Sequence, residues 1–141
     1  MTVVEGQRRF AAPPERVFGL LTDPDVIARA LPAVRGHTVI DADHWDAKVK
    51  PPLPFAPSIT IHFAVLDRRP PEHAALHAHG GGVDVTSTFD LAEDGDGTLM
   101  HWQTEIRFSG LLSHVAGPGL DVVAQRQAER TLDAVERALE I

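Results

Sequence analysis

The chain has 141 residues, a length that suits one domain able to bury most of its apolar surface around a single core. It holds 13 Lys and Arg against 20 Asp and Glu, and the formal net charge of −7 opposes non-specific attraction to nucleic acid or anionic lipid. Cysteine is absent, which excludes disulfides, thiolate metal ligands and a cysteine nucleophile.

The first ten residues lack the apolar run of a secretory signal, and no stretch reaches the roughly 20 apolar residues of a membrane-spanning helix. We therefore expect no transmembrane segment, a cytoplasmic location and one domain over residues 1–141. We expect no nucleic-acid partner either.

A short helix is expected in the stretch PPERVFGLLTDP, residues 13–24. Its apolar residues recur at helical spacing, and the Asp23-Pro24 pair ends the pattern because proline cannot continue a helix. A helix this short has little stability of its own, since nucleation is costly and few hydrogen bonds follow it. It must therefore dock on a larger structure.

Strands are expected over residues 35–109, where apolar residues alternate with polar ones between turns. A strand around Trp45 comes first. The segment 50–58, KPPLPFAPS, holds four prolines and predicts a stiff loop. Alternation resumes up to the triple glycine at 80–82, and it continues through the Asp- and Gly-rich turn near 94–97.

Tight turns near 68–71 and 94–97 predict which residues face each other in an antiparallel meander, because directly opposed side chains share one face. The expected pairs are all apolar: Phe63–Leu76, Ile61–Ala78 and Phe89–Trp102. One face of the sheet is therefore the inner face, and the charged members of each strand alternate to the outer face.

A long helix is expected from residue 111 to the end, and Gly117-Pro118-Gly119 should break or kink it. From 120 to 140 this helix would span about 30 Å, enough to lie across the whole sheet. Apolar residues recur every three or four positions and form one stripe, made of Leu120, Ala124, Ala128, Leu132, Val135 and Leu139.

The order of one strand, short helices, an antiparallel meander and a long C-terminal helix resembles the helix-grip fold of the START/Bet v 1-like (SRPBCC) superfamily. The segment 13–34, PPERVFGLLTDPDVIARALPAV, looks like the two short helices that brace one end of the sheet in that fold. The resemblance implies an α+β protein in which a curved antiparallel sheet wraps around the C-terminal helix, with two short helices after the first strand.

Within that superfamily the chain resembles the family of the G subunit of carbon monoxide dehydrogenase. The similar stretches are DP…LP at 23–32, HWDAKVK at 44–50, the Pro70-Pro71 turn, the Asp/Gly turn before Thr98-Leu99, and FSGLLSHVAGPGL at 108–120. This resemblance implies an accessory role toward a molybdenum-type oxidoreductase complex, with a quinone or another lipid-like ligand.

A sheet curved around one helix leaves a space between them, and such sites hold apolar ligands with a few polar contacts. We expect a hydrophobic small molecule, lipid- or quinone-like, to bind there without catalysis and without a cofactor. The alternative is that these side chains meet in a dry, filled core, which would leave a protein-interaction module. The expected cavity residues are Trp45, Val49, Ile61, Phe63, Leu76, Ser87, Phe89, Trp102, Thr104, Ile106, Phe108 and Gln127.

The proline-rich loop and the break before the last helix are expected at the cavity mouth. Apolar residues at the loop tip could admit a ligand or make peripheral contact with a membrane or a partner protein, or they could fold back onto the core. The glycines of the break could let the helix swing as a gate, or they could form a fixed break. The expected mouth residues are Leu53, Phe55, Gly117, Pro118 and Gly119.

The chain holds eight histidines, and the expected registers gather three of them on the outer face. His62 would lie opposite His77, with His79 one diagonal away and Asp84 opposite His79. Three imidazoles and a carboxylate suit zinc, but solvated histidines without a ligand explain the same pattern. We predict no metal site.

Catalysis would need a titratable group in a desolvated place, and the expected inner face has no Asp, Glu, Lys or His. The stretch HGGGV at 79–83 lacks the lysine and the strand–loop–helix context of a phosphate loop. We therefore predict no catalytic residue. A polyketide cyclase- or hydratase-like enzyme is the alternative, and it would need a buried acid or base that reaches into the cavity.

Overall fold

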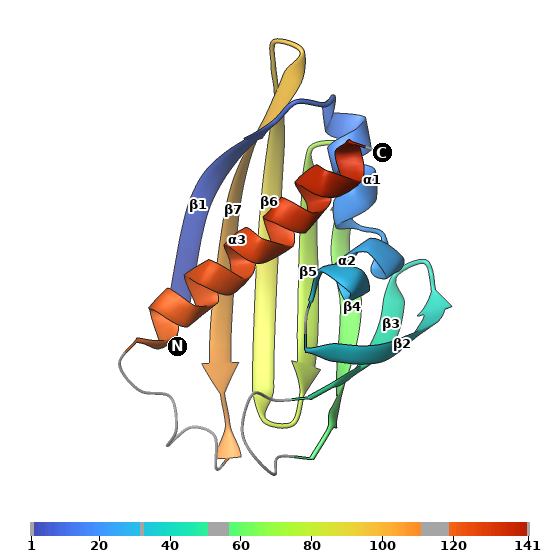
Figure 1. Ribbon diagram of the computed structural model, residues 1–141, viewed down its shortest axis with the longest axis vertical. Helices are drawn as coiled ribbons and strands as arrows, with labels where there is room; N and C mark the ends of the chain where they lie inside the picture. The colour runs from blue at the N-terminus through green and yellow to red at the C-terminus, as the bar shows by residue number, and fades with distance from the viewer. Residues whose placement is uncertain (1, 32, 51–56, 111–118, 141) are drawn as a thin grey trace.

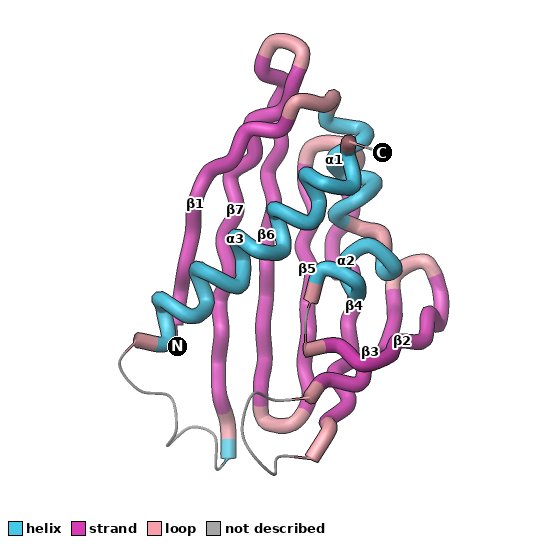
Figure 2. Tube along the Cα trace, in the orientation of Figure 1, coloured by secondary structure: helices cyan, strands magenta, loops and turns pink. Residues whose placement is uncertain are grey.

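The computed structural model describes residues 2–31, 33–50, 57–110 and 119–140 (Figures 1 and 2). Over these residues, two short helices follow the first strand, and a run of further strands leads to one long helix. The bounds are β1 Thr2–Phe10, α1 Pro14–Leu21, α2 Pro24–Ala30, β2 Val34–Asp41, β3 His44–Val49, β4 Ile59–Arg69, β5 His73–Gly80, β6 Val83–Asp94, β7 Gly97–Phe108 and α3 Leu120–Leu139.

The described strands form one seven-stranded antiparallel sheet in the order β1-β7-β6-β5-β4-β3-β2. Helix α3 crosses one face of this sheet diagonally, from the β1 edge toward α1, as Figure 1 shows. Helices α1 and α2 lie on the same face and contact α3. The α+β helix-grip fold expected from the sequence is therefore confirmed.

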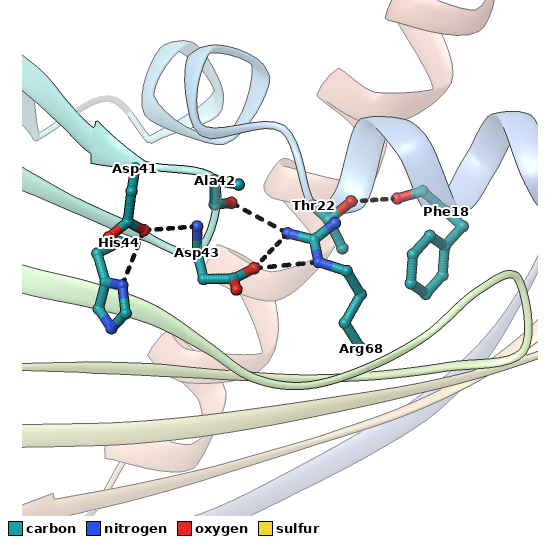
Figure 3. Close-up of polar contacts among 7 residues, drawn as sticks. All are labelled: Phe18, Thr22, Asp41, Ala42, Asp43, His44 and Arg68. Carbon is teal, nitrogen blue, oxygen red and sulfur yellow. Dashed lines mark hydrogen bonds and ion pairs between the residues drawn. The ribbon is translucent and has the colours of Figure 1, made fainter.

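The two short helices are delimited by proline and by side-chain caps. Helix α1 ends where Thr22 Oγ1 donates to the Phe18 carbonyl at 2.9 Å (Figure 3). Asp23 caps α2, because its carboxylate accepts the Asp25 N–H at 2.9 Å, while Pro24 occupies the first turn, where no N–H is needed. The predicted helix break at Asp23-Pro24 is confirmed.

A buried core fills the end of the molecule where α1 and the C-terminal half of α3 meet the sheet. Phe10 of β1, Met100 of β7, Val17 and Leu21 of α1, and Val135 of α3 are each at most 1% exposed. Burial of apolar side chains is the dominant favourable contribution to folding. Packing in this core therefore stabilises α1, which is too short to be stable on its own.

An ion-pair network joins the sheet edge to α3 at the same end. Arg8 Nη2 on β1 lies 2.6 Å from Asp133 Oδ1 and 2.7 Å from Glu136 Oε2, both on α3. Burial opposes the charge on Arg8, but the bonds to the two carboxylates outweigh it and raise the pKa of Arg8. Strand β1 and helix α3 are thus held together by charge as well as by packing.

A second packed cluster forms where α2 covers β3, and it contains Ala28, Trp45 and Ala47. The turn between β2 and β3 is fixed from β4 by Arg68, whose guanidinium donates to the Ala42 carbonyl and to Asp43 Oδ1 at 3.0–3.1 Å (Figure 3). The cavity described below lies between the two clusters, and residues of both contribute to its wall.

The sheet registers confirm one expected pairing and correct two. Phe89 lies opposite Trp102, as predicted. On β4 and β5, however, Phe63 lies opposite Ala78 and Val65 opposite Leu76, two positions away from the predicted pairs. The cause is a turn after Arg69 combined with a bulge between Val65 and Asp67. Because the shift is two residues, each side chain keeps its predicted face.

No helix among the described residues is both long and apolar enough to cross a membrane.

Candidate ligand cavity

A cavity of about 1030 Å³ lies between the inner face of the sheet and α3, and α2 and the start of β2 form a further wall. Ligand sites of proteins typically have volumes of roughly 300–1,000 Å³, so this space suits a small molecule. The alternative of a filled core does not hold. The cavity is lined by all twelve residues expected there: Trp45, Val49, Ile61, Phe63, Leu76, Ser87, Phe89, Trp102, Thr104, Ile106, Phe108 and Gln127.

Aromatic side chains form much of the sheet wall. The rings of Trp45 and Phe63, which are opposed on β3 and β4, stack at 3.9 Å between centroids with an interplanar angle of 9°. Phe89 and Trp102 are opposed on β6 and β7. Because adjacent strands present these rings on one face, the wall offers flat apolar surfaces to a ligand.

Part of the wall comes from elements that the strand pattern did not identify. These residues belong to the α1–α2 segment, the start of β2, the β5–β6 turn and the end of β7. Alternation along strands carries no information about how helices dock, although the apolar face of 13–24 was a signal that the segment packs on the sheet. The residues are Leu21, Thr22, Asp23, Pro24, Ile27, Leu31, Ala33, Val34, Gly81, Gly82, Ser109 and Gly110.

Polar side chains are sparse in the wall. Ser87 Oγ and Thr104 Oγ1 lie 3.0 Å apart and share a hydrogen bond across β6 and β7. On α3, Thr131 Oγ1 donates to the Gln127 carbonyl at 3.0 Å, so that hydroxyl is already satisfied by its own helix. The side-chain amide of Gln127 is a further polar group of the wall.

Ionisable side chains are also few along the described part of the wall. Asp23, the N-cap residue of α2, lines the wall, and one of its carboxylate oxygens accepts the Asp25 N–H. His77 contributes from β5, but its Nε2 lies 3.1 Å from Asp84 Oδ1 on the outer face. Asp23 was not among the expected cavity residues, because it comes from a helix cap and the expectation covered the inner face of the sheet.

A model of the family described as polyketide cyclase / dehydrase and lipid transport matches residues 1–140. The chain belongs to this family. No curated protein sequence matches the chain significantly.

Solved structures of other proteins share the helix-grip fold of this family member. A conserved protein from Geobacillus kaustophilus superposes with a TM-score of 0.81 at 17% identity, over 98% of this chain and 95% of that chain. A START superfamily protein from Mycobacterium smegmatis gives a TM-score of 0.76 at 18% identity, over 99% and 98%. Ara h 8.0201 gives a TM-score of 0.74 at 9% identity, over 96% of this chain and 95% of that chain. Identities this low establish the fold alone.

The expected mouth of the cavity falls largely outside the described residues of this family member. Leu53, Phe55, Gly117 and Pro118 all lie there. Gly119 is described: it precedes α3 as its N-cap, with a φ of 93° that favours glycine.

The outer-face histidines of this family member lie close together, in a register that differs from the prediction. His62 lies opposite His79 rather than His77, while Asp84 lies opposite His79 as expected. The His79 ring lies 5.3 Å from that of His62 and 5.0 Å from that of His77, and His62 Nδ1 lies 2.7 Å from Asp46 Oδ1. Among the described residues, no group of three or more potential ligands is arranged to hold a metal ion.

Proposed function

We propose that this protein binds a hydrophobic small molecule in the cavity between sheet and α3 and shelters it without chemical change. The observation that carries the proposal is the space of about 1030 Å³ with a predominantly apolar wall. Such a wall stabilises an apolar ligand by removing it from water, at about 25 cal/mol per Å² of buried apolar area. The name of the family, which includes lipid transport, supports the same function.

Binding can be tested with N-phenyl-1-naphthylamine, an uncharged dye whose fluorescence rises in apolar surroundings. We expect saturable uptake at one site per chain. The variant Ala78→Phe should reduce it, because Ala78 lines the cavity and lies opposite Phe63 and Val85 on the inner face. Ala75→Phe is the matched control, since Ala75 alternates to the outer face of the same strand.

Two results would contradict binding in the cavity. One is no uptake of the dye by the unaltered protein. The other is equal loss of uptake in Ala78→Phe and Ala75→Phe, which would place the dye elsewhere or reflect unfolding. Far-UV circular dichroism of both variants separates those two causes.

The identity of the ligand is best approached by native mass spectrometry of protein purified from its own host. We expect an added mass that is released by organic solvent and that corresponds to a lipid- or quinone-like compound. A bare protein mass, together with no response to quinones or fatty acids, would count against the proposal.

The family name also supports a second candidate, a polyketide cyclase- or hydratase-like enzyme using the same cavity. Such an enzyme needs an acid or base at the ligand, and Asp23 is the carboxylate that lines the described wall. If the bound compound is converted by the protein, Asp23→Asn should abolish conversion while binding persists. Conversion that continues unchanged in this variant would remove Asp23 from that role.

The resemblance to the G subunit of carbon monoxide dehydrogenase motivates a finer proposal, an accessory role toward a molybdenum-type oxidoreductase in the cytoplasm. It predicts that protein isolated from its host carries a molybdopterin-containing enzyme with it. The fluorescence of the oxidised pterin measures this directly, and its absence from the isolated complex would argue against the role.

A further inference from the structure

A single hydroxyl pair interrupts the apolar sheet wall of the cavity. Ser87 on β6 and Thr104 on β7 are directly opposed, and their oxygen atoms lie 3.0 Å apart. Both side chains are partly buried and both line the cavity. The pair is therefore open to a ligand in the cavity.

The hydroxyl pair lies in the middle of the wall rather than at its end. Along the two strands it is preceded and followed by apolar inner-face pairs, and on the two neighbouring strands its partners are also apolar. These surrounding residues are Phe89 and Trp102, Val85 and Ile106, Leu76 on β5, and Val4 on β1.

The pair has unused hydrogen-bonding capacity. Two hydroxyls carry two O–H donors, and the bond between them uses one. Within the described part of the chain, the second donor has no partner, and the side-chain amide of Gln127 on α3 has none either. Polar groups in apolar surroundings are stabilised when a partner is supplied, and a ligand can supply one.

The described wall has no cationic side chain available to pair with a negatively charged ligand. It contains no Lys or Arg side chain, and its one histidine, His77, already lies 3.1 Å from Asp84 Oδ1. Its one carboxylate, Asp23, would repel an anion. Burying an unpaired charge is strongly unfavourable. A ligand that ends in a carboxylate therefore cannot place that group inside the cavity without a large loss of affinity.

We propose that the cavity selects an uncharged, largely apolar ligand whose carbonyl or hydroxyl group lies between apolar parts and bonds to the Ser87–Thr104 pair, with Gln127 as a second contact from α3. This inference rests on the proposed binding function and narrows its ligand class. It favours ring ketones and quinone-like compounds over free fatty acids and plain hydrocarbons.

Three tricyclic compounds of the same framework test the inference: 9,10-anthraquinone, anthracene and anthracene-9-carboxylate. Their dissociation constants are measured by displacement of N-phenyl-1-naphthylamine. We expect anthraquinone to bind at least about tenfold more tightly than either of the others, because a site built for a hydrogen bond discriminates against analogues that lack the partner.

The double variant Ser87→Ala/Thr104→Val removes both hydroxyls while nearly preserving volume. We expect it to lose the preference for anthraquinone and to keep the affinity for anthracene. Thr131→Val is the matched control, because the Thr131 hydroxyl also lines the cavity but is already bonded to the Gln127 carbonyl. It should keep the preference.

The outcomes separate this inference from the function on which it rests. If the dye binds but anthraquinone shows no advantage, or keeps its advantage in the double variant, the hydroxyl-pair proposal is overturned and the binding function stands. If neither the dye nor any of the three compounds binds, the binding function itself fails. Tighter binding of the carboxylate than of anthraquinone would also overturn the selection for uncharged ligands.

Discussion

The indole ring of Trp102 lies against the backbone of Gly6, its direct partner on β1. A β-carbon added at Gly6 would lie 2.9 Å from Cζ2 of Trp102, closer than van der Waals contact allows. Trp102 is 4% exposed and lines the cavity, so the missing side chain at Gly6 is what lets this ring take its place in the wall.

Gly6→Ala should destabilise the protein by about 1–3 kcal/mol, because the ring must shift within a packed cluster. Thermal and denaturant unfolding measure this change, and the dye affinity should change with it. Gly36→Ala on β2 is the control: a β-carbon there meets nothing within 4 Å, so it should stabilise slightly, by about 0.5–1 kcal/mol. Equal stability of the two variants would show that the Trp102 ring leaves room for a side chain at position 6.

Arg8→Gln should cost about 1–3 kcal/mol of stability, since Asp133 and Glu136 would lose their shared partner in a partly buried position. The neighbouring Arg9 pairs with Asp94 at 3.0 Å, with both side chains about half exposed. Arg9→Gln should therefore change stability by only about 0–1 kcal/mol. Urea unfolding of the two variants gives the comparison, and a larger loss in Arg9→Gln would contradict it.

Asp23→Ala should lower stability by about 1 kcal/mol, because the Asp25 N–H at the start of α2 would lose its acceptor. Asp23→Asn should stay near the unaltered protein, since asparagine caps helices about as well. Thermal unfolding distinguishes the two. A loss of the same size in both variants would assign the effect to the charge of Asp23 rather than to the cap.

The carboxyl of Asp41 should titrate below its ordinary value near 3.8. Its pKa is lowered first by the hydrogen bond to His44 at 2.9 Å and then by the Asp43 N–H. A lowered folded-state pKa means that the contribution to stability is present above the ordinary value and is lost as the pH falls through the lowered one. Carbon-13 NMR measures the midpoint, which should move upward in His44→Ala. An unchanged midpoint would exclude His44 as the main cause.

The sequence predicted the fold and the inward-facing residues of the sheet more fully than it predicted which residues lie opposite each other on neighbouring strands. Alternation placed Phe63 and Leu76 on the inner face, and the structure finds both there. Their expected pairing was wrong because the turn follows Arg69, later than expected, and because a bulge between Val65 and Asp67 changes the register again. Alternation along a strand predicts neither feature. Asp23 was missed as a wall residue, since its position depends on how α2 docks.

Local periodicity by itself determined which side chains point inward, because the two-residue repeat of a strand and the 3.6-residue repeat of a helix are properties of neighbouring residues. Only the tertiary structure decided that a space of about 1030 Å³ stays open beneath those side chains. The separation of sheet and α3 depends on the core packed at one end and on the Arg8 ion pairs, which join residues more than 120 positions apart in the chain. Such long-range contacts leave no pattern in any short stretch of sequence.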